Sequence, residues 1–541
     1  MPELSPRQRL AVLALCCSSL LMVSLDNTVV NVALPAMARG LHASVSGLQW
    51  IVDAYTMVLA SLVMFAGATG DRFGRRRAFQ VGLAVFTVSS ALCSLAPSLD
   101  WLVAFRVMQA VGGSLLTPVG MSILSSVFTS GKERAWAIGV WVSTLGVGMA
   151  AGPVLGGVLT GTVGWRGVFW VNVPVGLAAS VLTRLLVPES RARSSRRPDP
   201  VAQILVIVML GSVVYAIIQG AHSDWRASGI RDLFVMAAVA FLALVVWEVR
   251  RTEPLIDPRF FRSLTFSGAM VTAVCAFACL SGFLFLSTIY LQDVRRLTPL
   301  AAGLHLLPAA AAIAVCPPLA PWLASRAGPR VPPMLGGLAL TLSMAAMSRL
   351  TGSTGNAYLV ATFAVFGFGV AMIDGQISSV AVSAMPLVQA GLASGIAATG
   401  RQVGQALGVA VSGALLDASM HGTVQVWFLR ASQSAWVMLG GCACTVTVLG
   451  LLTARARGAR GSVPDASEPR TQTPPPRRDS PQDPGRPWPP SPEWIPRYLM
   501  DLQPSDDPPA EAVTPVTAYR DHLFRPWQDR PGSTQPTGPG H

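Results

Sequence analysis

Apolar segments about 20 residues long recur along residues 10–453, separated by short polar connections. An α-helix needs about 20 apolar residues to cross a hydrocarbon layer about 30 Å thick, so each segment is long enough to span a membrane. The pattern therefore predicts an all-α membrane protein with fourteen spanning helices. The predicted helices cover residues 10–35, 49–68, 78–97, 101–124, 136–160, 166–187, 201–220, 231–249, 266–290, 301–323, 332–350, 357–380, 391–415 and 434–453.

Positively charged side chains in the connections predict which side of the membrane each connection faces. With the amino terminus in the cytoplasm, cationic residues on the cytoplasmic side outnumber the others by roughly two and a half to one, as the positive-inside rule requires. The connection between the second and third segments alone contains Arg72, Arg75, Arg76 and Arg77. Because the number of helices is even, both termini are expected in the cytoplasm. A shift of the assignment by one helix would reverse the charge ratio.

The composition excludes a soluble globular protein. Of the 541 residues, 52% are hydrophobic and 12% are charged, which is about half of the ~25% that is usual in soluble domains. The net charge of +13 does not predict nucleic-acid binding, because the arginines cluster in short connections where they set orientation. The eight cysteines lie within apolar segments without metal-ligand spacing, and no phosphate-binding loop or nucleophile motif stands out. We therefore expect neither an enzyme nor a metal site nor a cofactor.

The order of the segments predicts two halves of six helices with an additional helix pair inserted between them. A polar turn with Arg326, Gly328 and Arg330 follows the tenth segment much as the turn around Asp71 and Gly74 follows the second, so the halves are related by a weak duplication. Repeated helical halves are typical of transporters whose substrate site lies near the membrane midplane. The predicted units are residues 1–187, 188–262 and 263–455, followed by a tail over residues 456–541.

The tail is rich in proline and poor in apolar residues, so it is expected to be disordered. Two aromatic stretches, residues 494–499 and 519–527, interrupt it. They either have no specific role or dock a cytoplasmic partner through polyproline and aromatic contacts, and the sequence leaves both alternatives open.

Asp26 is the foremost candidate for chemistry because it lies inside the first apolar segment, close to Asn27 and Asn31. A carboxylate at membrane depth costs on the order of 2.5–3.5 kcal/mol on insertion scales, and such residues often mark proton or ion pathways. We therefore predict that Asp26 binds and releases a proton during transport. The alternative is that Asp26 only bonds to its neighbours, because buried polar residues also hold membrane helices together.

Arg106, in the fourth segment, is predicted to lie at a depth similar to that of Asp26. Its guanidinium group could hold Asp26 ionised until a proton or the substrate displaces it. Gln109, one helical turn onward, would point to the same side. The alternative is a structural ion pair that never titrates.

Glycines recur at a spacing of four in the fifth segment, at Gly148, Gly152 and Gly156, with Pro153 among them. Small residues at this spacing let helix backbones approach closely, and a proline interrupts the hydrogen bonds of the helix. This pattern predicts a hinge or a seal between the halves. Simple close packing of two helices is the alternative.

Polar residues in the second half are further candidates. Asp374 and Gln376 lie in the inner part of the twelfth segment, where an unpaired carboxylate would be costly, and Arg401 lies in the thirteenth. Asp374 either titrates or contacts a cationic group, or it only pairs with a nearby arginine. Asp53, near the outer end of the second segment, is expected to contact headgroups or water.

Several of these residues belong to ordered motifs that together resemble the major facilitator superfamily, specifically its fourteen-span drug:proton antiporter branch. The resemblance covers about residues 10–453. The motifs are Leu25 to Pro35, Gly67 to Arg77, Arg106 to Gln109, Gly152 to Gly157 and Trp165 to Gly176 in the first half, with Tyr290 to Gln292, Ala302 to Leu304 and Leu307 to Pro308 in the second.

This resemblance implies alternating access, in which the two halves rock about a central site. It implies that Asp26 is the proton-coupling carboxylate, that Arg106 is its charged neighbour and that the fifth helix is the hinge. It also implies a latch that places Asp71 near the cytoplasmic start of the thirteenth helix, where the helix dipole favours a carboxylate. The latch candidates are Gly67, Asp71, Arg72, Gly74 and Arg75, and the cavity candidates are Asn31, Gln109, Tyr290, Asp374, Gln376 and Arg401.

The predicted function is proton-coupled efflux of a small amphipathic or cationic organic compound, such as a drug or antibiotic, across the plasma membrane. The partners would be the substrate, protons and the lipid bilayer, and the carrier is expected to act as a monomer. An exporter of an endogenous metabolite, such as an amino acid, a peptide or a secondary product, is one alternative. A receptor or scaffold that no longer transports and acts through its tail is the other.

Overall fold

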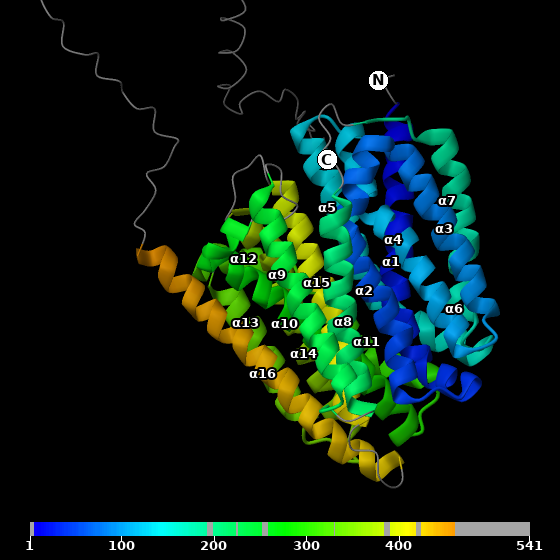
Figure 1. The fold of residues 1–541 in the computed structure, drawn as a ribbon, viewed down its shortest axis with the longest axis vertical. Coiled ribbons are helices and arrows are strands. Elements are labelled where there is room, and N and C mark those ends of the chain that lie inside the picture. The colour runs from blue at the N-terminus through cyan, green and yellow to red at the C-terminus, as the bar shows by residue number, and fades with distance from the viewer. Residues whose placement is uncertain are drawn as a thin grey trace, which may run out of the picture. The chain divides into compact units, whose positions relative to one another are not determined.

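The computed structural model describes residues 5–191, 199–222, 225–251, 258–328, 330–383, 390–417 and 424–459 (Figure 1). These residues fold into helices, and the described part of the chain contains no strand. Apart from residues 456–459, which belong to the last helix, the tail and its two aromatic stretches lie outside the described residues.

The first two helices begin where a serine side chain caps their free backbone N–H groups. Ser5 and Gln8 form a capping box at the first helix, and the Ser44 hydroxyl accepts a hydrogen bond from the backbone N–H of Gly47 at the second. The helices of the first half are α1 (Pro6–Leu41), α2 (Val45–Phe73), α3 (Arg75–Leu95), α4 (Leu99–Val127), α5 (Gly131–Thr162), α6 (Gly167–Trp170) and α7 (Asn172–Leu186).

The remaining helices follow the predicted order. The inserted pair is α8 (Pro200–His222) and α9 (Ser228–Arg250), and a 3-10 turn over Pro258–Arg262 follows it. The second half contains α10 (Leu264–Ile289) with a π-helical turn over Tyr290–Val294, α11 (Pro299–Val315), α12 (Leu319–Ala327), α13 (Val331–Met347), α14 (Asn356–Ser383), α15 (Ala390–Asp417) and α16 (Val424–Ala459).

Among the described residues, eleven helical stretches are long and apolar enough to cross a membrane, and the pair α11 and α12 raises this number to twelve if it counts as one span. Large apolar side chains are exposed on the outer surface, among them Leu185, Leu242 and Leu264. Such exposure is expected where lipid replaces water as the solvent. The chain is therefore a multi-pass membrane protein. Each predicted segment coincides with a helix or helix pair, but fourteen crossings exceed this count and stay a prediction.

The tenth predicted helix, residues 301–323, is not continuous. It is divided into α11 and α12, whose axes differ by 53°. Pro317 and Pro318 lie at the break, and neither residue has a backbone N–H to continue the helix. The prediction of one helix over residues 301–323 was therefore wrong at a position that the sequence marks with two adjacent prolines.

Packing brings the two halves together mainly along two boundaries. Within the first half, α1 packs on α5, and α4 packs on both α2 and α3. Within the second half, α10 packs on α15, and α13 packs on α14 and α16. The halves meet where α5 packs on α11 and where α2 packs on α15.

The inserted helix pair contacts both halves through α8, which packs on α2 and α15 (Figure 1). Asp199 fixes the start of α8, because its Oδ1 atom accepts hydrogen bonds from the backbone N–H groups of Val201 and Ala202, each at 3.1 Å. Its Oδ2 atom accepts a hydrogen bond from Trp247 Nε1 at 2.9 Å and pairs with Arg251 at 3.1 Å, which ties α9 to α8.

Candidate functional site

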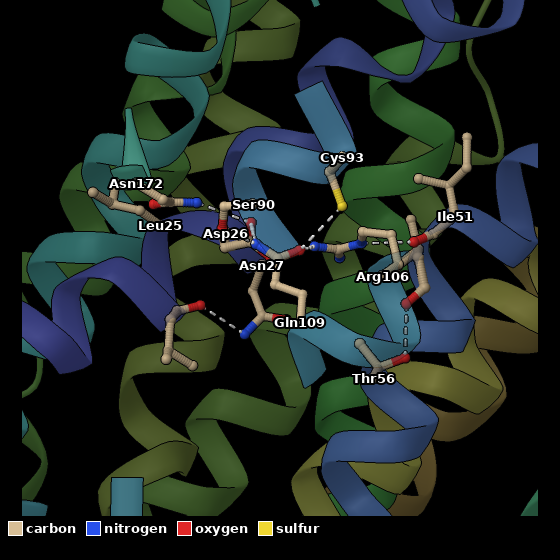
Figure 2. A network of polar contacts seen from close by, with 12 residues as sticks. Leu25, Asp26, Asn27, Ile51, Thr56, Ser90, Cys93, Arg106, Gln109 and Asn172 are labelled. Atoms are coloured by element: carbon tan, nitrogen blue, oxygen red, sulfur yellow. Dashed lines mark hydrogen bonds and ion pairs between the residues drawn. The ribbon is translucent and has the colours of Figure 1, made fainter. Parts of the chain in front are cut away.

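Asp26 lies in the middle of α1, and its carboxylate is completely buried. It forms an ion pair with Arg106 of α4, whose side chain is 1% exposed (Figure 2). The Oδ1 atom of Asp26 also accepts hydrogen bonds from Gln109 Nε2 at 2.9 Å and from Asn172 Nδ2 at 3.3 Å. The predicted proximity of Asp26 and Arg106 is thus present, and their role in proton coupling stays a prediction.

Arg106 is held by partners other than Asp26. Its Nε atom donates to the backbone carbonyl of Ile51 on α2 at 3.1 Å, and its Nη1 atom donates to Gln109 Oε1 at 2.8 Å. The guanidinium carbon lies 4.1 Å from the centroid of the Tyr55 ring, within the range of a cation–π interaction. The guanidinium group is therefore positioned by α2 and α4 as well as by α1.

Gln109 extends the network to α3. Its Nε2 atom donates to the hydroxyl of Ser90 at 2.8 Å, and the hydroxyl of Ser90 donates to the backbone carbonyl of Phe86 at 2.8 Å. Side chains of α2, α4 and α7 thus contact the ion pair, and Ser90 of α3 supports it through Gln109. Sequence reasoning missed Tyr55, Ser90 and Asn172 as members of the site. Of these three, only Asn172 could have been found from the sequence, because it is a polar residue within the motif from Trp165 to Gly176.

The arrangement allows two states of the ion pair. With both groups charged, each charge offsets the other in a site without water access, and removal of either one would leave an unpaired buried charge. With Asp26 protonated, Arg106 would lose its charged partner but keep the Ile51 carbonyl, the Gln109 amide and the Tyr55 ring. In the conformation seen here Asp26 is closed off from water, so binding of a proton there would require the surrounding helices to rearrange.

The glycines of α5 lie against the part of α1 that contains Asp26. A Cβ atom on Gly148 would lie 2.6 Å from the Cβ of Ser24, and one on Gly152 would lie 1.8 Å from Oγ1 of Thr28. The hydroxyl of Ser24 donates to the backbone carbonyl of Leu145 at 2.8 Å. A side chain at either glycine would push α5 away from α1, so the spacing is required for this contact.

The opposite contact of α5 crosses the boundary between the halves. A Cβ atom on Gly303 of α11 would lie 2.3 Å from the backbone carbonyl oxygen of Pro153. One on Gly157 would lie 2.6 Å from the carbonyl oxygen of Pro299, at the start of α11. On the side of α1, a Cβ atom on Gly156 would lie 2.9 Å from the backbone carbonyl oxygen of Val29. The predicted hinge residues therefore join α1, α5 and α11, whereas hinge motion itself stays a prediction.

The charged turn between α2 and α3 forms a compact unit. Gly74 has a φ of +114°, a conformation that residues with a Cβ rarely adopt. Arg75 Nε donates to Asp71 Oδ1 at 2.9 Å, and Arg75 Nη1 donates to the Ser122 carbonyl of α4 at 3.2 Å. Of the other latch candidates, Gly67 lies against Pro118, and Arg72 lies over the Phe73 ring.

Asp71 is therefore paired with Arg75 within its own turn. Its predicted neighbour, the start of the thirteenth helix, corresponds to the start of α15 at Ala390. Residues 384–389 before it lie outside the described residues, and the latch stays a prediction.

Glu189, which follows α7, is a member of this turn that sequence reasoning missed. Its Oε1 atom accepts a hydrogen bond from the backbone N–H of Arg76 at 3.2 Å, at the start of α3, where an acidic group offsets the helix dipole. Its Oε2 atom lies 3.7 Å from Nε of Arg77 and 3.9 Å from Nε of Arg76. A Cβ on Gly74 would lie 2.6 Å from Glu189 Oε1, so glycine also makes room for this carboxylate.

Asp374 and Arg401 form the corresponding pair of the second half. Arg401 Nε donates to Asp374 Oδ1 at 2.8 Å, with 36% of the Asp374 side chain and 18% of the Arg401 side chain exposed. The pairing of Asp374 with an arginine agrees with the structural alternative that the sequence left open. Gln376, two residues onward, is half-buried.

Asn31 and Tyr290 are buried, and their partners are backbone carbonyls. Asn31 Nδ2 donates to the carbonyl of Asn27 at 2.9 Å, while its Oδ1 atom has no hydrogen-bond partner among the described residues. The hydroxyl of Tyr290 donates to the carbonyl of Thr351 at 2.7 Å. In this conformation Tyr290 thus fixes the loop after α13, and its predicted place in a cavity stays untested.

Asp53 does not lie where the sequence suggested. It was expected to contact headgroups or water, but its side chain is completely buried within α2. The predicted helix began at residue 49, whereas α2 begins at Val45, so Asp53 lies two turns inside the helix. Both carboxylate oxygens lack a hydrogen-bond partner among the described residues.

An apolar pocket lies between the halves. It is lined by Thr28 of α1, Pro153 of α5, Phe283 of α10, Leu306 of α11 and Phe366 of α14, among others. The Phe283 and Phe366 rings stack with their centroids 3.8 Å apart. None of the predicted cavity residues lines this pocket, which is formed by apolar and aromatic residues that the sequence did not distinguish from the core.

Known transporters share this fold. The chain is similar to a solved bacterial homologue of the human lysosomal transporter Spinster in an inward-facing and unoccupied conformation, with a TM-score of 0.60, 18% identity and coverage of 85% of this chain and 100% of that one. A peptide transporter POT in complex with sulfate gives a TM-score of 0.61 at 15% identity, covering 83% and 95% of the two chains. The fold is thus that of a multi-pass helical membrane transporter.

The particular family follows from the sequence match. Residues 16–409 match the Major Facilitator Superfamily, and the chain belongs to this family. Relatives include the multidrug resistance protein Stp of Mycobacterium tuberculosis, at 37% identity over 76% of both chains. The tetracenomycin C resistance and export protein of Streptomyces glaucescens is 38% identical over 73% of this chain and 74% of its own. The resemblance to the superfamily is confirmed, and the fourteen-span antiporter branch stays a prediction.

Proposed function

We propose that this protein exports small amphipathic or cationic organic compounds across the plasma membrane in exchange for protons. Relatives that match 73% to 77% of the chain are named multidrug resistance, antibiotic resistance and export, or multidrug efflux proteins, which supports drug export. The observation that carries the proton-coupled mechanism is the buried ion pair of Asp26 and Arg106, formed at membrane depth and closed off from water.

Proton exchange at Asp26 is coupled to the position of Arg106. In this conformation the pair is charged and closed. When the helices rearrange and water reaches the site, a proton binds the carboxylate, and Arg106 keeps its bonds to Ile51 and Gln109. Asp26 and Thr28, which lines the apolar pocket between the halves, both belong to α1, so a movement of this helix would couple the carboxylate to the proposed substrate site.

The apolar pocket is the proposed substrate site. Thr28 is a polar group on its wall, and stacked Phe283 and Phe366 form an aromatic wall on the side of the second half. Aromatic faces attract organic cations and apolar compounds alike. This lining suits amphipathic compounds of varied shape, because it places few directional hydrogen-bond requirements on the substrate.

Alternating access is proposed to use α5 as the hinge and the turn between α2 and α3 as the latch. The close contacts of Gly148, Gly152 and Gly156 with α1 allow small sliding movements without steric interlocking of large side chains. The protein is proposed to belong to the fourteen-span branch, to act as a monomer and to keep both termini in the cytoplasm. Its tail is proposed to be dispensable for transport.

The test is Asp26→Asn in proteoliposomes, with ethidium as a fluorescent amphipathic cation and an imposed pH gradient. We expect pH-driven ethidium transport to fall to the background of empty vesicles, because asparagine cannot carry a proton through the cycle. Ethidium binding to the purified variant should persist, since the pocket lining is unchanged. Normal pH-driven transport by this variant would contradict the role of Asp26.

Asp100→Asn is the matched control. Asp100 is exposed in the first turn of α4, and the same chemical change there should leave transport at the wild-type level. A loss of transport in both variants would point to a nonspecific defect in insertion or reconstitution, which the ethidium binding measurement detects.

A further inference from the structure

Asp53 is a buried carboxyl group that the mechanism above does not use. Its side chain is completely buried, and neither Oδ1 nor Oδ2 has a hydrogen-bond partner among the described residues. Asp26, equally buried, receives bonds from Arg106, Gln109 and Asn172. Two acids of the same half thus lie in opposite surroundings, one fully paired and one without a partner.

The position of Asp53 on α2 places it at the boundary between the halves. Gln49, one turn before it, donates to the Ala410 carbonyl of α15 at 2.7 Å. Met57, one turn after it, packs against an apolar cluster that includes Ala406 and Ala410 of α15, and lines a pocket shared by α2, α8 and α15. Residues four apart lie on the same face of a helix, so Asp53 lies on the face of α2 that meets α15.

The charged and titratable groups on the elements around α2 have other partners. Arg106 of α4 directs its bonds to Asp26, Gln109 and the Ile51 carbonyl, and Tyr55 lies beside its guanidinium group. On the other elements, Arg401 of α15 is bonded to Asp374, and Asp417 is the last residue of α15, beyond the Ala410 contact with Gln49. Tyr215 of α8 lies against the Trp50 ring, Asp26 of α1 pairs with Arg106, and Cys93 of α3 lies near Gln109.

An ionised carboxylate with no partner is strongly disfavoured in a site without water, whereas the neutral acid loses far less on burial. We propose that Asp53 carries a proton in this conformation and is a second proton-binding site of the carrier, located where α2 and α15 join the two halves. The link to transport rests on the proposed function. In the chemical step, the carboxylate binds one proton to give the neutral acid, and the neutral acid loses this proton to water when water reaches the site.

Movement of the halves would expose this site. As α2 separates from α15, the contacts of Gln49 and Met57 with α15 break, and water reaches the carboxyl group between them. Asp53 then ionises because water solvates the charge. Closure of the same boundary requires the proton again, so the protonation of Asp53 is tied to the closed α2–α15 contact.

Infrared difference spectroscopy of the purified full chain tests the protonation state directly. Wild type should show the carbonyl stretch of a protonated carboxylic acid at neutral pH, shifted in heavy water. Asp53→Asn and Asp53→Leu should both lose this band, and Asp100→Asn should keep it. A band that is unchanged in the Asp53 variants, or absent from wild type, would overturn the proposal.

Folding does not obscure this test. Asp53 has no bond to lose among the described residues, so Asp53→Leu should unfold at the same temperature as wild type or at a higher one. A large decrease in the unfolding temperature of both Asp53 variants would reveal a bonded carboxylate and would also overturn the proposal.

Proteoliposomes with ethidium test the coupling. Asp53→Asn should lose pH-driven transport to the background of empty vesicles but keep ethidium exchange at equal pH, which needs no net proton movement. Normal pH-driven transport by this variant would overturn the second proton site while the proposed function stands. Wild-type vesicles without pH-driven transport would instead contradict the proposed function, and the infrared band would still decide the protonation of Asp53.

Discussion

Each half of the protein contains a carboxylate paired with an arginine, and the two pairs differ in exposure. Asp26 and Arg106 join α1 to α4 with 0% and 1% of their side chains exposed. Asp374 and Arg401 join α14 to α15 with 36% and 18% exposed. The same two chemical groups thus meet in one site without water and in another that water reaches.

The contribution of an aspartate–arginine pair to stability therefore depends on its burial as well as on its two chemical groups. In the buried pair both charges are desolvated, and each depends on the other and on neutral donors and acceptors. In the half-exposed pair water solvates each group separately, so the pair is weaker and easier to break. Substitutions in both pairs test this comparison.

Arg106→Gln is expected to have the largest effect on stability. It leaves Asp26 buried with Gln109 and Asn172 as its hydrogen-bond donors, and the free energy of unfolding should fall by about 3–5 kcal/mol. Denaturant unfolding of the protein in detergent micelles measures this change. A decrease no larger than that of a surface substitution would show that the pair is not desolvated as described.

The double variant Asp26→Leu/Arg106→Met tests whether an unpaired buried charge causes the loss of stability in Arg106→Gln. Replacement of both charges by apolar groups of similar size should restore most of the stability lost in Arg106→Gln, because no unpaired charge remains, and such swaps are neutral or stabilising by about 1–4 kcal/mol. Transport driven by pH should nevertheless be absent. If the stable double variant still transports ethidium in response to pH, the pair serves structure alone.

The contact of Asp26 with Arg106 could be predicted from depth in the membrane, and the helix positions from apolar segments, because crossing a bilayer imposes a narrow range of lengths. The rest of the network could not. Tyr55 and Asn172 reach the ion pair from α2 and α7, and Ser90 of α3 reaches its neighbour Gln109. Their convergence depends on packing that no local pattern encodes.

The errors of prediction have physical causes. Asp53 was expected near water because apolar character marked the helix start too late, whereas the Ser44 cap begins α2 at Val45. The continuous apolar pattern of residues 301–323 predicts one helix, whereas Pro317 and Pro318 divide it into α11 and α12. The apolar pocket could not be predicted, because nothing in the sequence distinguishes Phe283 and Phe366, which line it, from phenylalanines of the packed core.

Asp374→Asn is expected to have the smallest effect of the three variants. Water screens this pair, and Arg401 also lies 5.7 Å from the centroid of the Phe277 ring, so the substitution should cost about 0.2–1 kcal/mol. The cost should shrink further as salt is raised, since salt screens exposed charges, while the effect of Arg106→Gln should hardly depend on salt. Denaturant unfolding at low and high salt measures both variants. Equal and salt-independent losses in the free energy of unfolding would mean that both ion pairs are equally shielded from water, which would contradict the difference in burial between the two halves.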